Sequence, residues 1–331
     1  MTDIAAEVHQ FGEDFARVRT EIAKAIVGHA EVVDGLLMCL LCGGHALLEG
    51  VPGLGKTLLV KSLGAALHLN FSRIQFTPDL MPADIIGTRV VSQDEAGKRY
   101  FEFQKGPVFS HIVLADEINR ATPRTQSALL EAMQEQTVTV GGIGYALPPP
   151  FLVLATQNPL DMEGVYPLPE AQLDRFFVKL QVHYPSFADL SEIVDRTTQR
   201  QEQQLQPVLH TARILEAQQL VREVPLASHV KSYAIRLVMA THPQPSTASE
   251  RIQRYVRYGS SPRGVQSLVL AAKVRALFHG RFQVSFEDLR LVALPCLRHR
   301  LILNFEGEAE GIDPADLLHE ILEQLPEQAP R

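Results

Sequence analysis

The strongest chemical signal in the sequence is a glycine-rich run that ends in a lysine and a threonine, Gly50–Thr57. It reads Gly-Val-Pro-Gly-Leu-Gly-Lys-Thr and fits the pattern G-x-x-x-x-G-K-[ST] in full. Glycines let a backbone curl so that its N–H groups face phosphate oxygens. We therefore expect a phosphate-binding loop in which Lys56 reaches the β- and γ-phosphates of a nucleotide and the Thr57 hydroxyl binds Mg²⁺.

Two adjacent carboxylates follow a second apolar run. Ile112–Ala115 contains no polar residue, and Asp116 and Glu117 come directly after it. A carboxylate at the end of a buried strand beside a phosphate-binding loop is suited to hold Mg²⁺ through water, and a second one can orient and polarise an attacking water. Small-molecule kinases do not need that second acid. The pair therefore predicts nucleotide hydrolysis, with Glu117 as the catalytic carboxylate.

Three further polar residues occupy positions of interest. Asn158 follows the apolar run Phe151–Ala155, where it would face the γ-phosphate, although an asparagine before Pro159 fits a turn equally well. Arg175 stands between an aspartate and two phenylalanines, and Arg263 falls in the first turn of a predicted helix that begins with proline. Taken alone, each arginine is more typical of a surface ion pair than of a catalytic role.

Strand and helix patterns alternate over the first part of the chain. Short apolar runs predict strands, and apolar residues at helical spacing predict helices. The expected strands are 45–49, 112–115 and 151–155, and the helical patterns cover 1 to about 42 and 57–67. This order predicts an α/β fold with a parallel sheet flanked by helices. Only helical patterns continue after 184–186, so we expect a core over 1–186 and a smaller all-α lid domain over 187–331.

Two stretches of the expected core are longer than a tight connection needs. The first, Phe71–Phe109, contains an alternating segment at 99–103 that is typical of a strand. The second, Thr137–Leu147, resembles a hairpin around Gly141-Gly142. We expect both to be insertions that add surface for a task other than folding.

Composition narrows the class of protein. Hydrophobic residues make up 46% and charged residues 21%, which is typical of a globular chain. A net charge of −7 argues against a general electrostatic grip on nucleic acid. Cys39, Cys42 and Cys296 are interpreted as small buried hydrophobes rather than as a zinc site, because no second Cys or His pair accompanies the first two. An acidic N-terminal segment without an apolar core predicts no signal peptide, so a cytoplasmic protein is expected.

The order of these segments resembles the AAA+ ATPases, and most closely the MoxR family. The resemblance runs from Ile26-Val27-Gly28 to about Asn304. Its most specific stretches are Arg73–Leu80, Asp116–Ala121, Thr125–Glu131, Ala155–Pro159 and Leu297–Leu301. The fold that it implies is a P-loop AAA+ core followed by the helical lid, with Phe71–Phe109 as the helix-2 insert and Thr137–Leu147 as the hairpin before sensor 1.

The resemblance also implies roles for individual residues. Asn158 matches sensor 1, Arg175 the arginine finger that enters the neighbouring subunit's site, and Arg263 sensor 2, which reaches from the lid to the γ-phosphate. The nucleotide would be held by Ile26, Val27, Gly50, Pro52, Gly53, Leu54, Gly55, Lys56, Thr57, Leu58 and Asp116, and Mg²⁺ by Thr57 and Asp116, partly through water. Gly264 departs from the alanine that is frequent in the family, which would loosen the start of its helix. Arg120 is a further candidate for contact with the neighbouring subunit.

The implied function is ATP hydrolysis by a ring, with a hexamer as the family expectation. Such a ring would act as a chaperone-like remodeller that matures, activates or loads cofactor into a client protein, with a separate partner that carries a von Willebrand factor A domain. The alternative is a nucleic-acid-associated motor or loader, which the acidic charge and a hairpin tip without Lys or Arg disfavour. A GTP-binding switch is disfavoured because the sequence has no Asn-Lys-x-Asp.

Overall fold

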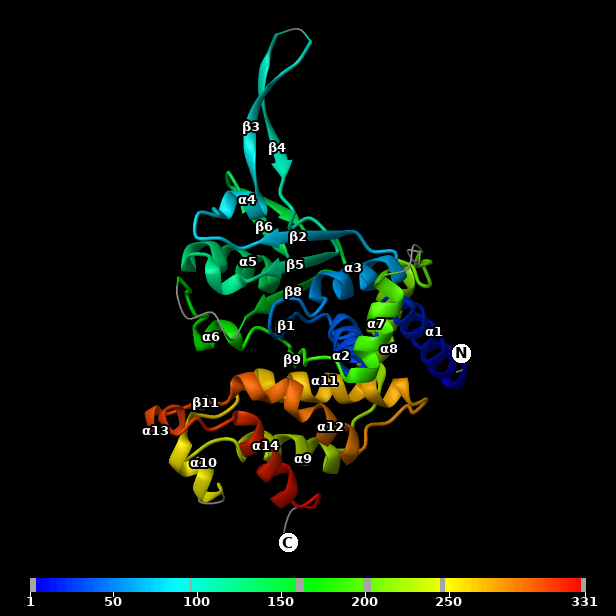
Figure 1. Cartoon of the computed structure of the whole chain (residues 1–331), viewed down its shortest axis with the longest axis vertical. Coiled ribbons are helices and arrows are strands. Elements are labelled where there is room, and N and C mark those ends of the chain that lie inside the picture. The colour runs from blue at the N-terminus through cyan, green and yellow to red at the C-terminus, as the bar shows by residue number, and fades with distance from the viewer. Residues whose placement is uncertain (1–3, 96, 159–163, 199–203, 245–247, 329–331) are drawn as a thin grey trace.

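A parallel sheet forms the centre of the first domain in the computed structural model, which describes residues 4–95, 97–158, 164–198, 204–244 and 248–328. Five strands lie in the order β2-β5-β8-β1-β9, and all their pairings are parallel. The strands are β1 (Ala46–Glu49), β2 (Phe71–Gln75), β5 (Ile112–Asp116), β8 (Leu152–Gln157) and β9 (Val178–Gln181). The predicted α/β fold is confirmed (Figure 1).

Alternate residues of each strand face two separate hydrophobic cores, as the period of two of a β-strand requires. On one face, Leu48, Leu114 and Leu154 pack with the helices α1 (Ile4–Ala25), α2 (Ala30–Leu41), α3 (Lys56–Ala66) and α8 (Thr211–Glu223). On the other face, Val113 and Val153 pack with α5 (Pro123–Glu135). The sheet is therefore buried between two layers of helices.

The helical pattern at the start of the chain is two helices rather than one. The break lies at Gly28 and His29, whose φ angles of 70° and 56° are left-handed and incompatible with a continuous α-helix. The turn brings Ile26 and Val27 beside the segment that follows β1.

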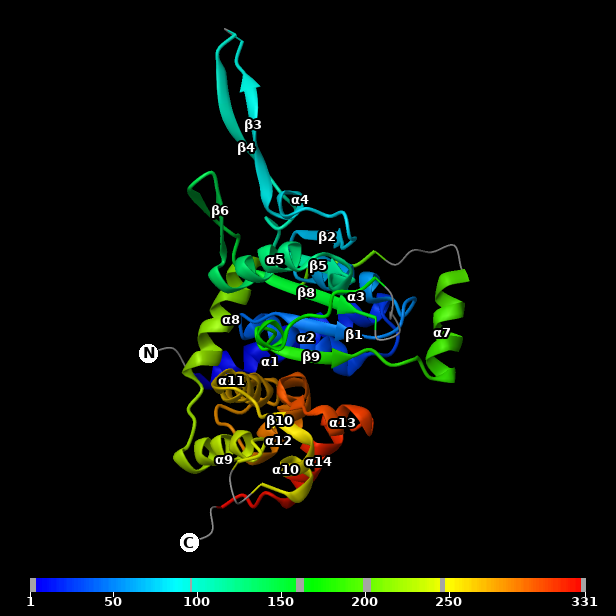
Figure 2. The same cartoon turned by 90° about the vertical axis from the view of Figure 1, so that its left-hand side faces the viewer.

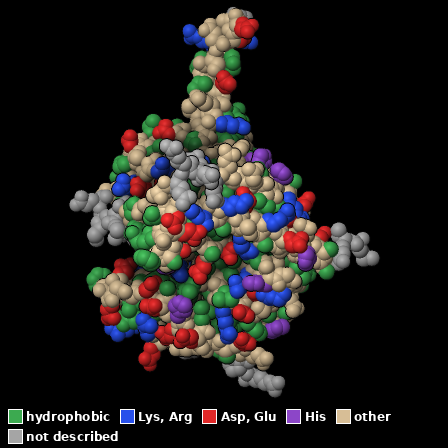
Figure 3. Space-filling view, turned by 45° about the vertical axis from the view of Figure 1, so that its right-hand side comes forward, with side chains coloured by type: hydrophobic (Ala, Val, Ile, Leu, Met, Phe, Trp, Pro, Cys, Tyr) green, Lys and Arg blue, Asp and Glu red, His purple; other side chains and the backbone are tan. Residues whose placement is uncertain are grey.

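Two antiparallel hairpins project from the sheet. The longer one, β3 (Gly87–Gln93) with β4 (Arg99–Lys105), follows the short helix α4 (Pro82–Ile86), and Figures 1 to 3 show it standing clear of the body. The shorter one is β6 (Thr137–Val140) with β7 (Ile143–Ala146). The rings of Phe103 and Tyr145 stack with centroids 4.1 Å apart, so the two hairpins support each other at the base.

The expected insertion over Phe71–Phe109 begins too early. Its first five residues are β2, which pairs in parallel with β5 and belongs to the central sheet. The sequence of β2 mixes polar and apolar residues because the strand is the outermost of the sheet and its side chains are less covered: only Ile74 is buried. The projecting part therefore starts only after Gln75.

Over 204–244 and 248–328, the C-terminal part is helical apart from one short ribbon. Its helices are α9 (Ser228–Met239), α10 (Glu250–Tyr255), α11 (Pro262–Phe278), α12 (Phe286–Leu297), η2 (Arg298–Arg300), α13 (Phe305–Ala309) and α14 (Pro314–Gln324). The ribbon, β10 (Val256–Tyr258) with β11 (Ile302–Leu303), was not expected, because strands of two and three residues leave no readable alternation. We call this region, from α9 onward, the lid.

The lid lies along the β9 side of the sheet, where α11 contacts α2 and α12 contacts β9 (Figures 1 and 2). Between β9 and the lid come α7 (Phe187–Thr198) and α8, and α8 contacts both α2 and α11. The boundary near 186 falls between β9 and α7, and it stays a proposal because α8 belongs to both packing units. None of the helices in the described residues is long and apolar enough to cross a membrane.

A buried histidine ties the start of β1 to its surroundings. His45 Nδ1 accepts a hydrogen bond from the Val153 N–H at 3.0 Å, and Nε2 lies 3.0 Å from the Met133 carbonyl oxygen. Burial lowers the pKa of His45 from its usual 6.5 to about 4, and the Met133 contact offsets this only in part. The folded protein therefore keeps this ring neutral at pH values where the unfolded chain protonates it.

We predict that His45→Asn reduces the acid sensitivity of the fold. Because the unfolded chain binds a proton below the usual pKa of 6.5 while the native ring stays neutral down to about 4, the free energy of unfolding falls as the pH drops through that window. The wild type should lose about 2 kcal/mol more than the variant between pH 6.5 and about pH 4.5 in urea titrations. His9→Asn, at an exposed site, is the control; an unchanged pH dependence in His45→Asn would contradict the prediction.

Candidate active site

The glycine-rich run forms a tight loop between β1 and α3. A Cβ at Gly50 would lie 2.8 Å from the Val182 carbonyl oxygen, so only glycine fits there. Gly55, with φ 74°, precedes the first turn of α3, whose free N–H groups and positive dipole end are suited to bind phosphate. Lys56 Nζ donates to the Gly50 carbonyl oxygen at 2.5 Å, so the amine already lies across the mouth of the loop.

A pocket of about 350 Å³ adjoins this loop, which is a volume suited to a small organic group. Ile26 and Val27 line one side of it, as expected for a base-binding pocket. The loop contributes Pro52, Gly53, Leu54, Gly55 and Leu58. Burial lowers the pKa of His29, which lines the same pocket, so its ring is neutral at neutral pH.

The opposite wall of this pocket was not predicted. It consists of Tyr184, Pro185 and one side of α7 with Leu190 and Ile193. Arg196 of α7 donates to the carbonyl oxygens of Ala23 and Lys24 at 2.8 and 2.7 Å, which holds α7 against the end of α1. The signal in the sequence was an amphipathic helix whose apolar residues remain partly exposed in the fold.

The two carboxylates lie at the end of β5, held by neighbouring strands. Asp116 accepts from the Thr156 hydroxyl at 2.6 Å and forms an ion pair with Arg73 at 2.7 Å. Glu117 accepts from Gln75 Nε2 at 2.9 Å. Its backbone is left-handed, with φ 56°, and its N–H donates to Thr156 Oγ1 at 2.8 Å. Both carboxylates therefore have defined orientations on β5, between β2 and β8.

Arg120 is the second partner of Glu117. Its Nε lies 3.3 Å from a Glu117 carboxylate oxygen, and its side chain is 47% exposed. Within one chain it therefore contacts the catalytic candidate directly. Its expected contact with a neighbouring subunit stays a prediction.

Strand register brings the predicted residues together at the carboxyl ends of the strands. Ala115 of β5 is opposite Ala155 of β8, and Glu49 of β1 is opposite Gln157 of β8. Asp116 ends β5, Glu117 and Asn158 come directly after β5 and β8, and the loop from Gly50 follows β1, so these residues lie side by side where the strands end. Pro159, also part of the predicted motif, lies outside the described residues.

Arg73, Gln75 and Thr156 are site residues that the sequence analysis did not assign. Arg73 and Gln75 are two positions apart on β2 and so point to the same side. The expected insertion over Phe71–Phe109 includes Arg73 and Gln75, so the sequence did not place them beside the acidic pair. The signal for the two β2 residues was the alternation polar-apolar-polar of Arg73, Ile74 and Gln75.

The two predicted arginines lie at the opposite end of the strands, near the amino end of β1. Arg175 comes just before β9, and its Nη1 donates to the Leu130 carbonyl oxygen at 3.0 Å. Arg263, at the start of α11, lies 3.7 Å from Asp174. Both line a second pocket with Gly43 and Gly44, which precede β1.

The phosphate-binding loop follows the carboxyl end of β1, whereas this second pocket adjoins its amino end. Arg263 is therefore not among the residues that line the loop pocket of its own chain, and the expectation that it reaches the phosphates is not met within one subunit.

Gly264 has a packing reason. A Cβ at this position would lie 2.0 Å from Ser260 Oγ and 3.0 Å from Leu297 Cδ2. Glycine therefore permits a close approach of the α11 start to Ser260 and Leu297, and the expected loosening of the helix stays a prediction.

Family models match both parts of the chain. Residues 45–178 match the model described as "ATPase family associated with various cellular activities (AAA)", and residues 248–321 match the AAA lid domain.

Full-length relatives extend the match. The chain is 42% identical to "Chaperone MoxR1" of Mycobacterium tuberculosis over 97% of its own length and 83% of the relative's. It is 30% identical to "Protein MoxR" of Methylorubrum extorquens, with 94% of each chain covered. A crystal structure of a candidate ATPase from Cytophaga hutchinsonii superposes with a TM-score of 0.90 at 41% identity, with 97% of each chain covered. Because these matches span the phosphate-binding loop, the acidic strand end and the lid together, the chain belongs to the MoxR family of AAA+ ATPases and hydrolyses ATP.

Proposed function

We propose that the protein works as a ring, a hexamer by family expectation, in which each active site is completed by the next subunit. The observation that carries the proposal is the position of the arginines: Arg175 and Arg263 adjoin the amino end of β1, and the phosphate-binding loop follows its carboxyl end. One chain cannot bring both to a single nucleotide. When subunits are arranged head to tail around a ring, the surface of one that carries Arg175 and Arg263 faces the surface of the next that carries the phosphate-binding loop.

Within a subunit, the residues at the carboxyl ends of the strands bind the nucleotide and Mg²⁺. Lys56 and the N–H groups of the loop bind the phosphates, and the apolar pocket at Ile26 and Val27 takes the adenine. Thr57 and Asp116 would hold Mg²⁺, which when bound neutralises charge on the β- and γ-phosphate oxygens. Their hydroxyl and carboxylate oxygens are the ligand types that this ion prefers.

Glu117 is the residue that orients water for hydrolysis. Its carboxylate accepts a hydrogen bond from Gln75 of the neighbouring strand, which holds it at the carboxyl ends of the strands, where the phosphates would lie. The attacking water forms a bond to the γ-phosphorus as the bond to the β–γ bridging oxygen breaks, ADP leaves and phosphate takes up the water oxygen. Asn158, at the end of the strand between β5 and β1, contacts the water or the γ-phosphate.

The arginine from the neighbouring subunit supplies positive charge where negative charge develops. Such a group is worth roughly 10³ to 10⁵ in rate. Arg175 is the finger in this proposal, and Arg263 lines the same pocket and approaches the same neighbour. Hydrolysis then depends on assembly, and changes in the subunit interface are coupled to phosphate release.

The work performed by the ring is remodelling of a client protein. The support is the name "Chaperone MoxR1" of a relative and the two projecting hairpins of this chain. The β3–β4 hairpin exposes Val91, Tyr100 and Phe101, side chains suited to contact protein. Maturation or cofactor loading of the client, a partner with a von Willebrand factor A domain and a cytoplasmic location complete the proposal. The three buried free cysteines fit a reducing compartment.

A nucleic-acid motor remains the less favoured alternative. The turn between β6 and β7 carries no Lys or Arg. On the face shown in Figure 3, basic and acidic side chains are interspersed rather than gathered into a basic stripe. Protein clients fit these surfaces better.

We predict that Glu117→Gln binds ATP but stalls. The amide keeps the size of the side chain and loses the negative charge that orients water, so kcat should fall by about 100-fold or more while the Kd for ATP changes little. Steady-state ATPase assays and equilibrium binding of a fluorescent ATP analogue measure the two quantities. Glu323→Gln, an exposed site on α14, is the matched control. Near-normal turnover in Glu117→Gln would remove this residue from the mechanism.

We predict that ATPase activity per subunit rises with protein concentration as rings form. Arg175→Ala should assemble at the same concentrations yet lose about 10³-fold in turnover, because the charge supplied to the neighbour is absent. Activity and sedimentation velocity are measured on the same samples, with Arg257→Ala, an exposed arginine of the lid, as control. A fully active monomer, or a silent Arg175→Ala, would disprove the shared site.

A further inference from the structure

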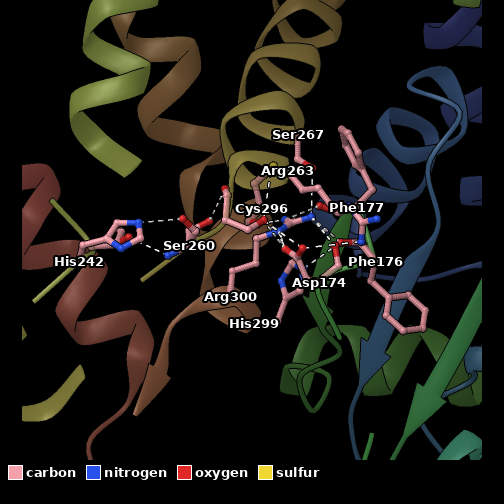
Figure 4. Close-up of polar contacts among 12 residues, drawn as sticks. Asp174, Phe176, Phe177, His242, Ser260, Arg263, Ser267, Cys296, His299 and Arg300 are labelled. Carbon is pink, nitrogen blue, oxygen red and sulfur yellow. Dashed lines mark hydrogen bonds and ion pairs between the residues drawn. The ribbon is translucent and has the colours of Figure 1, made fainter. Parts of the chain in front are cut away.

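A buried arginine of the lid lies directly beneath the segment that carries the finger. Arg300, in η2, has a side chain that is only 2% exposed. Figure 4 shows its guanidinium pointing from the lid into the turn that leads to β9. A buried guanidinium is retained only where its donors are satisfied, so its partners indicate what it holds.

Its partners on the core side, Asp174, Phe176 and Phe177, flank the finger Arg175. Nε donates to the Asp174 carboxylate at 3.0 Å, Nη2 to the Phe176 carbonyl oxygen at 2.8 Å, and Nη1 to the Phe177 carbonyl oxygen at 3.2 Å. Nη2 also approaches the Asp174 carbonyl oxygen at 3.4 Å. Arg175 lies between these anchored residues, so the course of its backbone is set by Arg300.

The same guanidinium is bound within the lid. Nη2 donates to Ser267 Oγ of α11 at 3.1 Å, and Nη1 donates to the carbonyl oxygen of Cys296 in α12. One rigid, planar group therefore joins two lid helices to the turn before β9. A lysine could not reproduce this, because its single amine cannot donate in five fixed directions.

Two other lid residues form hydrogen bonds with the same turn. The Ser261 hydroxyl lies 2.8 and 2.9 Å from the two Asp174 carboxylate oxygens, and His299 Nε2 lies 2.9 Å from the Phe176 carbonyl oxygen. Burial lowers the pKa of His299, so its ring is neutral and Nε2–H donates. Asp174 before the finger and Phe176 after it are thus both bound to the lid.

We infer that Arg300, with Asp174 as its partner, is a positioning residue for Arg175, through which the lid of one subunit sets the activity of the site in the next. The inference rests on the proposed function, in which Arg175 acts across the subunit interface. Arg300 itself touches no nucleotide: it orders the turn that presents the finger. Movement of the lid then changes where Arg175 points without any change in the phosphate-binding loop.

Subunit mixing tests this. Glu117→Gln subunits have inactive sites but intact fingers, whereas Arg300→Met subunits have intact sites and misplaced fingers. Alone, Arg300→Met should bind the fluorescent ATP analogue normally and hydrolyse ATP at least about tenfold more slowly. Mixed with Glu117→Gln and reassembled, it should gain activity at least about fivefold per Arg300→Met subunit, because a neighbour now supplies a well-placed arginine.

Two further variants keep the test decisive. Arg300→Lys retains a positive charge near Asp174 and carries the same test if the methionine variant does not assemble. Arg281→Met is the matched control, because Arg281 forms a two-pronged pair with the buried Asp288 elsewhere in the lid, at 2.7 and 2.8 Å. It should lower the melting temperature but leave turnover per assembled subunit unchanged.

The outcomes separate the inference from the proposed function. If Arg175→Ala also gains activity on mixing with Glu117→Gln, the shared site stands, and recovery by an Arg300 variant supports the positioning role. If Arg175→Ala recovers and no Arg300 variant does, or if the Arg300 variants are fully active alone, the inference is overturned while the shared site survives. If Arg175→Ala does not recover, the shared site itself fails.

Discussion

The parallel direction of the central strands is the constraint on which the rest depends. Because all five strands run the same way, residues at or after their carboxyl ends gather on one side of the sheet, and residues that precede their amino ends gather on the opposite side. The loop from Gly50, the Asp116-Glu117 pair and Asn158 lie at the carboxyl ends of the strands, and Arg175 lies at the amino ends. Hydrogen-bonded register thus separates these two groups of residues within each chain, and in the proposed ring the association of subunits would bring them together.

The lid and the sheet share one hydrophobic core. The core on one face of the sheet continues through α1 and α2 into α11 and α12, so the lid is joined to the sheet by apolar contact as well as by the Arg300 network. The polar network sits where the lid meets the turn before β9 (Figure 4). Apolar burial supplies most of the attraction between the parts, while the directional bonds of Arg300 determine their relative orientation.

Features that depend on local sequence were predictable, and features that depend on tertiary pairing were not. The phosphate-binding loop, the apolar strands, the β6–β7 hairpin and the strand β4 of the longer hairpin follow from spacing alone, because the backbone needs glycine or alternation at those places. Arg73 and Gln75 could not be assigned, since their role exists only once β2 lies beside β5. Arg300 was part of the stretch that resembles the family, but its burial against Asp174 joins residues 126 positions apart. The position of Arg263 likewise depends on how the lid packs.

The most direct measurement is a structure of the assembled ring with Mg²⁺ and a non-hydrolysable ATP analogue. In the proposed ring, the γ-phosphate held by Lys56 of one subunit should lie within hydrogen-bond distance of the Arg175 guanidinium of the next. Glu117 of the first subunit should face the water in line with that phosphate. A ring in which Arg175 stays on the Leu130 carbonyl oxygen, with no group from a neighbour at the γ-phosphate, would contradict it.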